Sequence, residues 1–157
     1  MPTSGEYLRS VVRVFPDYAD TVLWFAPGPV SYEDAHLSPE LTRDMQAWEE
    51  FFYANSDGLG TWHTFSAKTY DAEGLRLCER LADEVGDVVG VEYRSDRKGV
   101  KKVLLRGVGH GTNSEARAAF EAMIQESERQ DAYFAQLRAE GHTFRWVAYK
   151  PAEGDKS

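Results

Sequence analysis

The sequence predicts an α+β protein whose core, residues 62–150, follows the βαββαβ order of a ferredoxin-like fold, with two helices on one face of an antiparallel sheet. Short β-branched and aromatic segments alternate there with two long stretches of helical periodicity. The 157 residues are 42% hydrophobic and 13% aromatic, which is enough apolar material for an ordinary core. We therefore expect one domain over residues 1–157, with residues 7–60 as an N-terminal extension packed onto the core.

The extension is predicted to begin with two strands. Residues 8–15 (LRSVVRVF) alternate roughly between apolar and polar side chains and end at a proline, and residues 22–25 form a shorter strand. The segment 26–29 contains two prolines and a glycine, which interrupt a hydrogen-bonded ladder and indicate a turn. At roughly 60 residues the extension is too small to be stable alone.

An acidic helix is predicted next, from residue 39 to about residue 54. Ser38 is a favourable N-cap, Pro39 suits the first helical position, and Glu40 lies in the first turn, where the helix dipole stabilises a negative charge. Apolar side chains recur at helical spacing and define a buried stripe: Leu41, Met45, Trp48 and Phe52. The acidic side chains are therefore expected to face solvent or a partner.

The predicted core elements are a strand, a helix, a hairpin of two strands, a long helix and a last strand, at residues 62–66, 69–85, 88–94, 100–106, 112–140 and 142–150. Gly86 is expected to end the first of these helices. The long helix begins at Thr112-Asn113-Ser114-Glu115, which has the spacing of a capping box. We expect the tail, residues 151–157, to be mobile.

The overall charge disfavours several classes of function. The chain has 26 acidic and 18 basic residues, a formal charge of −8, and this charge repels nucleic acid. One cysteine cannot form an internal disulfide, residues 1–5 do not resemble an export signal, and no apolar stretch is long enough to span a membrane. These features predict a cytoplasmic protein that does not bind membranes.

The charge is also unevenly distributed. Residues 31–57 contain seven carboxylates and one arginine, whereas residues 94–106 contain six basic residues and one aspartate. A negative surface raises the encounter rate with a basic protein, and aromatic side chains beside it lose water on contact. The candidate partner-binding residues are Glu33, Asp34, Glu40, Asp44, Glu49, Glu50, Tyr53 and Trp62. The alternative is an acidic helix face that only keeps the protein soluble.

A second candidate site is the glycine-rich loop that precedes the long helix. Small residues let backbone N–H groups approach an anion, and the N-terminus of a helix adds partial positive charge. The residues that would bind an anion or another ligand are Arg106, Gly109, His110, Gly111 and Asn113. The loop lacks the lysine and the spacing of a P-loop, so a plain connection with a good helix cap is the alternative.

The sequence assembles no catalytic set and no metal site, and we expect no cofactor. The four histidines lie in different elements without metal-ligand spacing. Cys78 lies on an apolar helix stripe, where a buried and unreactive thiol is expected.

The predicted hairpin of residues 88–106 is called the basic hairpin below, because residues 94–106 carry its six basic side chains. Two interpretations of it remain open. In one, Lys101 and Lys102 contact RNA phosphates, and in the other the lysines protect an exposed strand edge against aggregation.

Two stretches carry resemblances to known families. The run Trp62-His63-Thr64-Phe65-Ser66, the elements after it and Trp146 resemble the ferredoxin-like regulators that inhibit ribonuclease E, the regulator of ribonuclease activity B family. The runs Leu23-Trp24 and Leu37-Ser38-Pro39-Glu40-Leu41, followed by Trp48, resemble small bacterial proteins of the immunity type, which are partners of secreted toxins. Neither resemblance implies a catalytic residue, and the basic hairpin departs from the acidic ribonuclease regulators.

These features favour a non-enzymatic acidic protein that binds and inhibits a basic protein, either as the immunity partner of a toxin or as the regulator of a nuclease. The alternative is a small-ligand-binding or enzymatic relative of the dimeric α+β-barrel proteins, with a pocket between the sheet and the helices. The lining of that pocket would include His63, His110, Trp146 and Tyr149.

Overall fold

The computed structural model describes residue 7, residues 9–56 and residues 66–143, and within them a five-stranded sheet forms the centre of the protein. The strands are β1 (Val11–Val14), β2 (Leu23–Phe25), β3 (Gly28–Pro29), β4 (Gly90–Tyr93) and β5 (Val103–Arg106). Their order across the sheet is β3-β2-β1-β4-β5. β1 and β4 run parallel, whereas the other neighbours are antiparallel. The predicted α+β class is confirmed.

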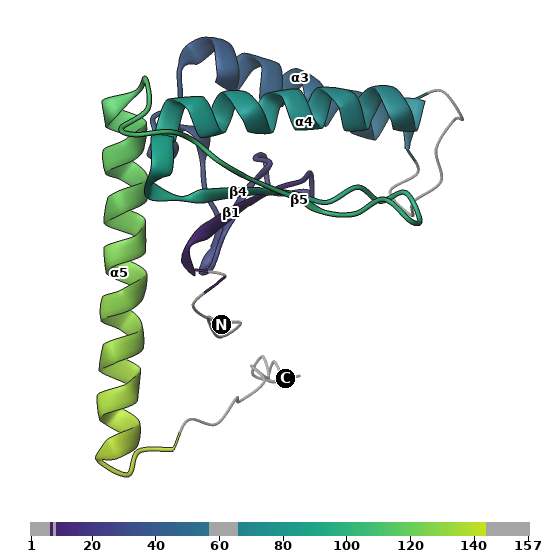
Figure 1. Ribbon diagram of the computed structural model, residues 1–157. Helices are drawn as coiled ribbons and strands as arrows, with labels where there is room; N and C mark the ends of the chain where they lie inside the picture. The colour runs from purple at the N-terminus through teal and green to yellow at the C-terminus, as the bar shows by residue number, and fades with distance from the viewer. Residues whose placement is uncertain (1–6, 8, 57–65, 144–157) are drawn as a thin grey trace, which may run out of the picture.

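Helices cover one face of this sheet and stand at one end of it. The helical elements are α2 (Tyr32–Ala35), α3 (Pro39–Asn55), α4 (Ser66–Val85), the short 3₁₀ helix η1 (Gly86–Val88) and α5 (Ser114–Ala139). Figure 1 shows α3 and α4 side by side above the sheet, and α5 at the end of the sheet, extending well beyond it. The covering pair is therefore α3 and α4, not the two helices of the predicted core. The apolar stripe of α5 is short, since Ala116 and Phe120 are its buried residues.

The hydrophobic core lies between the sheet and the pair α3 and α4. Val12 and Val14 of β1 are fully buried in it, together with the predicted stripe of α3. Trp48 at the centre of α3 stacks on Tyr70 of α4 with ring centroids 4.3 Å apart, and its indole N–H donates to the Tyr70 carbonyl oxygen at 3.0 Å. Because the Trp48 ring is stacked and its N–H is hydrogen-bonded, this residue holds α3 and α4 at a fixed distance.

The N-terminal strands lie inside the main sheet and do not form an extension beside it. β1 is the central strand because both of its faces are covered: Val12 faces the helices, and Val11 on the opposite face is only 2% exposed. Alternation along the sequence gives no information on whether the second face of a strand is also buried, so this position was not predictable from residues 8–15 alone. Residues 62–65 and 144–150, which hold most of two predicted strands, lie outside the described residues. The last residue of the first of these strands, Ser66, begins α4.

One carboxylate near the end of α4 joins three helices. Glu84 accepts hydrogen bonds from the Ser38 backbone N–H at 3.0 Å, from the Ser38 hydroxyl, and from the Asn113 side-chain amide at 3.1 Å. Ser38 and Asn113 are the N-caps of α3 and α5. The negative charge therefore lies at the positive ends of two helix dipoles, where it is favourable.

We expect Glu84→Ala to lower the free energy of unfolding by about 2 kcal/mol, because the substitution removes charge-assisted hydrogen bonds from two helix N-termini. Urea denaturation followed by circular dichroism measures the change. Asp83→Ala is the matched control, since this neighbouring side chain is exposed, and it should change stability by less than about 0.5 kcal/mol. Equal effects of the two substitutions would contradict the role of Glu84.

Candidate functional site

The predicted partner-binding residues do not form one cluster. Glu33 and Asp34 are exposed on α2, and Glu40 and Glu50 are exposed at opposite ends of α3. Trp62 lies outside the described residues. The remaining acidic residues of the set, Asp44 and Glu49, flank the buried stripe of α3 on its two sides and have different surroundings.

Asp44 is part of an internal link between helices. Its carboxylate accepts a hydrogen bond from Arg80 of α4 at 2.6 Å, and this bond is the main reason that the pKa of Asp44 is lowered. A carboxylate that is already neutralised by an arginine of the same chain contributes little to the attraction of a partner. Asp44 therefore joins α3 to α4, and its predicted contact with a partner stays a prediction.

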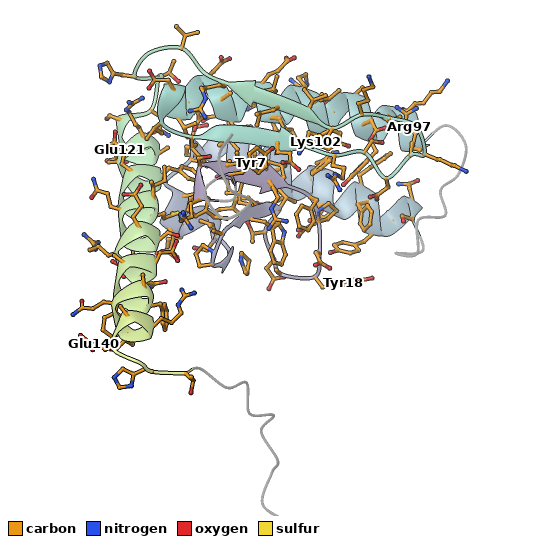
Figure 2. All side chains as sticks on the ribbon, turned by 60° about the horizontal axis from the view of Figure 1, so that its bottom comes forward. Tyr7, Tyr18, Arg97, Lys102, Glu121 and Glu140 are labelled. Carbon is orange, nitrogen blue, oxygen red and sulfur yellow. The ribbon has the colours of Figure 1, made fainter. Side chains whose placement is uncertain are left out.

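Glu49, Glu50 and Tyr53 lie beside a loop that the sequence analysis did not single out. The residues that gather here, called the acidic–tyrosine patch below, are Asp17, Tyr18, Asp20, Glu49, Glu50 and Tyr53. The Tyr18 backbone N–H donates to the Tyr53 hydroxyl at 2.8 Å, and the two rings lie 5.1 Å apart. Tyr18 is 78% exposed and projects from the surface (Figure 2).

The loop holds Tyr18 and Asp20 in an unusual backbone conformation. Their φ angles are +50° and +56°, in the left-handed region that non-glycine residues rarely adopt. Strained residues of this kind cluster at functional sites, because the surrounding structure must maintain them. The one signal in the sequence was the run Asp17-Tyr18-Ala19-Asp20 after a proline, in which two acids flank a tyrosine.

The carboxylates of the patch repel one another. Burial raises the pKa of Glu49, and the nearby charges of Asp20 and Glu50 raise it further. One carboxylate oxygen of Glu49 is buried without a hydrogen-bond donor among the described residues. Glu49 also lines a hollow of about 200 Å³, together with Tyr18, Asp20 and Tyr53. A cationic group placed in this hollow would supply the missing counter-charge.

The second predicted site, the glycine-rich loop, packs tightly against the end of α4. Gly111 approaches so closely that a Cβ atom there would lie 2.4 Å from the Glu84 carbonyl oxygen. The backbone N–H groups of Thr112 and Asn113 donate to carbonyl oxygens of α4 at 3.0 and 3.1 Å. The Asn113 side chain caps α5 and bonds to Glu84, so it is fully engaged.

The other members of that predicted site have mixed surroundings. Arg106 donates to the Asp87 carbonyl oxygen at 2.7 Å, and Gly109 and His110 are exposed. Arg106, His110 and Gly111 do line a common hollow, but the carboxylates of Glu79 and Asp83 line it too. Anion binding at this loop stays a prediction, and the two carboxylates oppose it.

The basic hairpin is held against α4 by hydrogen bonds and an ion pair. Arg97 forms a hydrogen-bonded ion pair with the buried Asp71, which also accepts hydrogen bonds from Tyr93 at 2.6 Å and Ser95 at 2.7 Å. This network attaches the hairpin to α4.

Cys78 is fully buried, and burial raises the pKa of its thiol to about 12, so the reactive thiolate is disfavoured.

Within residues 7, 9–56 and 66–143, no group of three or more histidine, cysteine, aspartate or glutamate side chains is placed to hold a metal ion. Over the same residues, no helix has both the length and the apolar character that a membrane crossing requires. Of the lining predicted for a pocket between sheet and helices, His63, Trp146 and Tyr149 lie outside the described part, and His110 is exposed on its loop.

The structure is an α+β fold with acidic and tyrosine side chains gathered on the loop 17–20 and on α3. The family model described as Serratia CdiI immunity protein-like matches residues 10–96, which is more than half of the chain, and the chain belongs to this family. No curated protein and no solved structure matches the sequence of this chain. The predicted immunity-type resemblance is thereby confirmed, whereas the comparisons give no support to the resemblance to ribonuclease regulators.

We expect Gly107→Ala to destabilise the protein by at least about 2 kcal/mol, because the new Cβ would lie 2.0 Å from the Ala82 carbonyl oxygen. Thermal and urea denaturation measure this loss. Gly99→Ala in the hairpin is the control. Its Cβ would meet open space, and only its φ of +81° makes it unfavourable, at a cost of roughly 1 kcal/mol. A tolerated Gly107→Ala would contradict the packing role of the loop.

Proposed function

We propose that this chain is an immunity protein that binds a toxin and blocks its activity. The family match over residues 10–96 carries the proposal. The matched segment contains β1 to β4, both covering helices and the whole acidic–tyrosine patch. Inhibition by binding requires a contact surface and no catalytic residues, which agrees with the absence of a catalytic set in the sequence.

We further propose that the acidic–tyrosine patch contacts the toxin and that the contacting surface of the toxin is basic. Tyrosines are favoured as anchors in protein interfaces because they bury a large area and lose little conformational entropy. Tyr18 and Tyr53 are both exposed, at 78% and 37%, and carboxylates surround them. The negative charge would steer a cationic partner toward these anchors.

The direct test expresses a candidate toxin, taken from the genes that flank the coding sequence of this chain, in a bacterial host with and without the chain. Growth arrest that is relieved when the chain is co-expressed supports the proposal. Arrest that persists at equal expression of the two proteins contradicts it. Purified proteins then allow the affinity to be measured by calorimetry.

We expect Tyr18→Ala to weaken toxin binding by at least about tenfold while leaving the fold intact, because Tyr18 is an exposed anchor in the proposed contact. Tyr133→Ala is the matched control. Tyr133 is 59% exposed on α5, outside the patch, and its removal should leave the affinity unchanged. Equal affinities of the unaltered chain, Tyr18→Ala and Tyr133→Ala for the toxin would place the contact elsewhere on the surface.

We expect Glu49→Gln to stabilise the isolated protein near neutral pH and to slow association with the toxin by about threefold or more. The raised pKa of Glu49 means that folding disfavours its ionised form. As the pH rises from 4.5, the ordinary pKa of a glutamate, through the higher pKa of Glu49 in the folded protein, the folded protein loses stability relative to the unfolded chain. Thermal denaturation between pH 4 and pH 8 should show a weaker loss of stability with rising pH for Glu49→Gln than for the unaltered protein.

The control for this substitution is Glu128→Gln on the exposed surface of α5, which removes the same charge away from the patch. It should leave both the pH profile and the association rate nearly unchanged. A Glu49→Gln protein that is less stable than the unaltered chain at pH 7 would show that Glu49 is an ordinary structural carboxylate.

A further inference from the structure

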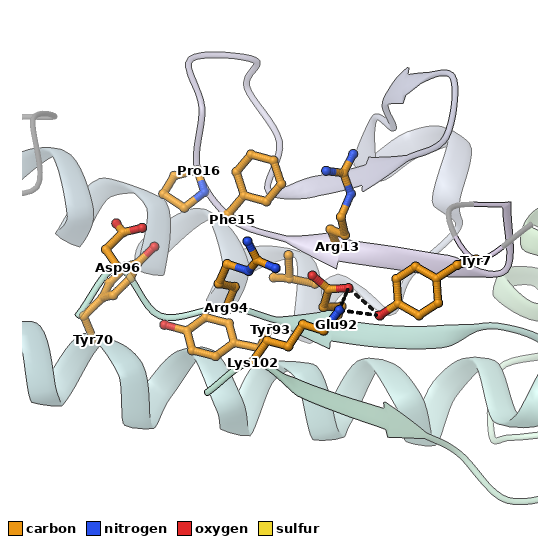
Figure 3. A pocket seen from close by; sticks show the side chains of 11 residues that line it. Tyr7, Arg13, Phe15, Pro16, Tyr70, Glu92, Tyr93, Arg94, Asp96 and Lys102 are labelled. Carbon is orange, nitrogen blue, oxygen red and sulfur yellow. Dashed lines mark hydrogen bonds and ion pairs between the residues drawn. The ribbon is translucent and has the colours of Figure 1, made fainter. Parts of the chain in front are cut away.

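A hollow of about 490 Å³ lies at the ends of β1 and β4 and is lined by other residues than the acidic–tyrosine patch. Residues 13–16 and several residues between 92 and 96 line it, and they are the last residues of the two strands and those directly after them. Figure 3 shows the charged and aromatic side chains that converge there. The proposed contact with a toxin does not use this hollow.

The topology of the sheet explains why a hollow forms at this place. β1 and β4 are adjacent parallel strands, so their carboxyl ends lie at the same edge. After β1 the chain turns to β2 on one side, and after β4 it turns to β5 on the other side. The two connections diverge and leave a crevice between them, which is the usual position of ligand sites in sheets that contain parallel strands.

A buried carboxylate at the centre of the hollow has its own partners. The side chain of Glu92 is 7% exposed, and it accepts a hydrogen bond from the Tyr7 hydroxyl at 2.6 Å. The ammonium group of Lys102 lies 3.8 Å from the same carboxylate, as the dashed lines in Figure 3 show. Glu92 and Lys102 therefore compensate each other, and neither contributes net charge to the hollow.

Two arginines in the hollow form no ion pair with any carboxylate in the described part of the chain. Arg13 lies beside Glu92 in the register of the sheet, and its guanidinium lies 5.7 Å from the ring centroid of Phe15. Arg94 follows the end of β4 and is exposed. Asp96 also lines the hollow, so these two cations face one exposed carboxylate.

We propose that this hollow binds a small organic anion whose carboxylate or phosphate group lies between Arg13 and Arg94. Guanidinium groups bind both oxyanions through paired, charge-assisted hydrogen bonds. The ring of Phe15 also lines the hollow and offers an aromatic wall to an apolar part of the ligand. The ligand class is therefore an aromatic or other apolar carboxylate or phosphate ester.

The experiment is isothermal titration of the full chain with phenyl phosphate, benzoate and inorganic phosphate at low salt. Binding of phenyl phosphate or benzoate with one site per chain supports the proposal, and their relative affinities tell a phosphate ligand from a carboxylate ligand. Inorganic phosphate should bind at least about tenfold more weakly than phenyl phosphate, because it makes no contact with the aromatic wall. Benzylamine, a cation of similar shape, should not bind.

Substitutions locate the site. Arg13→Gln and Arg94→Gln should each weaken the binding by about tenfold or more, and the double variant should abolish it. Arg43→Gln, which removes one charge from an exposed arginine of α3, should have no effect. Circular dichroism confirms that each variant is folded, and the exposed position of Arg94 keeps that variant informative even if Arg13→Gln unfolds the protein. Absence of binding to the unaltered chain, or undiminished binding to Arg94→Gln, would overturn the proposal.

Discussion

The parallel pairing of β1 with β4 determines the positions of most other features of this protein. β1 pairs with β2 on one side and with β4 on the other, so it lies inside the sheet, and Val11 and Val12 are buried on its opposite faces. The pairing with β4 joins two segments that are far apart in the sequence and brings α3 and α4 over the same face. Because antiparallel hairpins leave β1 and β4 toward opposite edges, the pairing also creates the crevice at their carboxyl ends.

The connection after β1 separates two surfaces of opposite character. Phe15 and Pro16 line the hollow that holds Arg13 and Arg94, and the residues directly after them carry the acids and the tyrosine of the patch. Charges of opposite sign are thus presented on neighbouring surfaces without neutralising each other.

The glycine-rich loop before α5 resembles an anion-binding loop in the sequence, but close packing of its backbone against α4 explains its glycines. Gly86, Gly107 and Gly111 allow the loop before α5 to lie against the end of α4, and carbonyl oxygens occupy the space that a Cβ would need. Glu84 then joins the N-caps of α3 and α5 at the same place. A glycine-rich run before a helix therefore has two explanations, and the side chains that surround it distinguish them.

The sequence alone determined several features: the α+β class, the N-cap Ser38, the buried stripe of α3 and the hairpin of β4 and β5. Each depends on interactions between residues that are close in the chain, so spacing and residue type suffice to predict them. The capping-box spacing predicted Thr112 as the N-cap of α5, whereas the structure has Asn113 one residue later. Only the tertiary structure decided that β1 is central, that Tyr18 contacts Tyr53, and that Asp44 is neutralised by Arg80. These contacts join distant segments, and the free energy that selects them comes from burial and charge pairing across the whole fold, which no local pattern records.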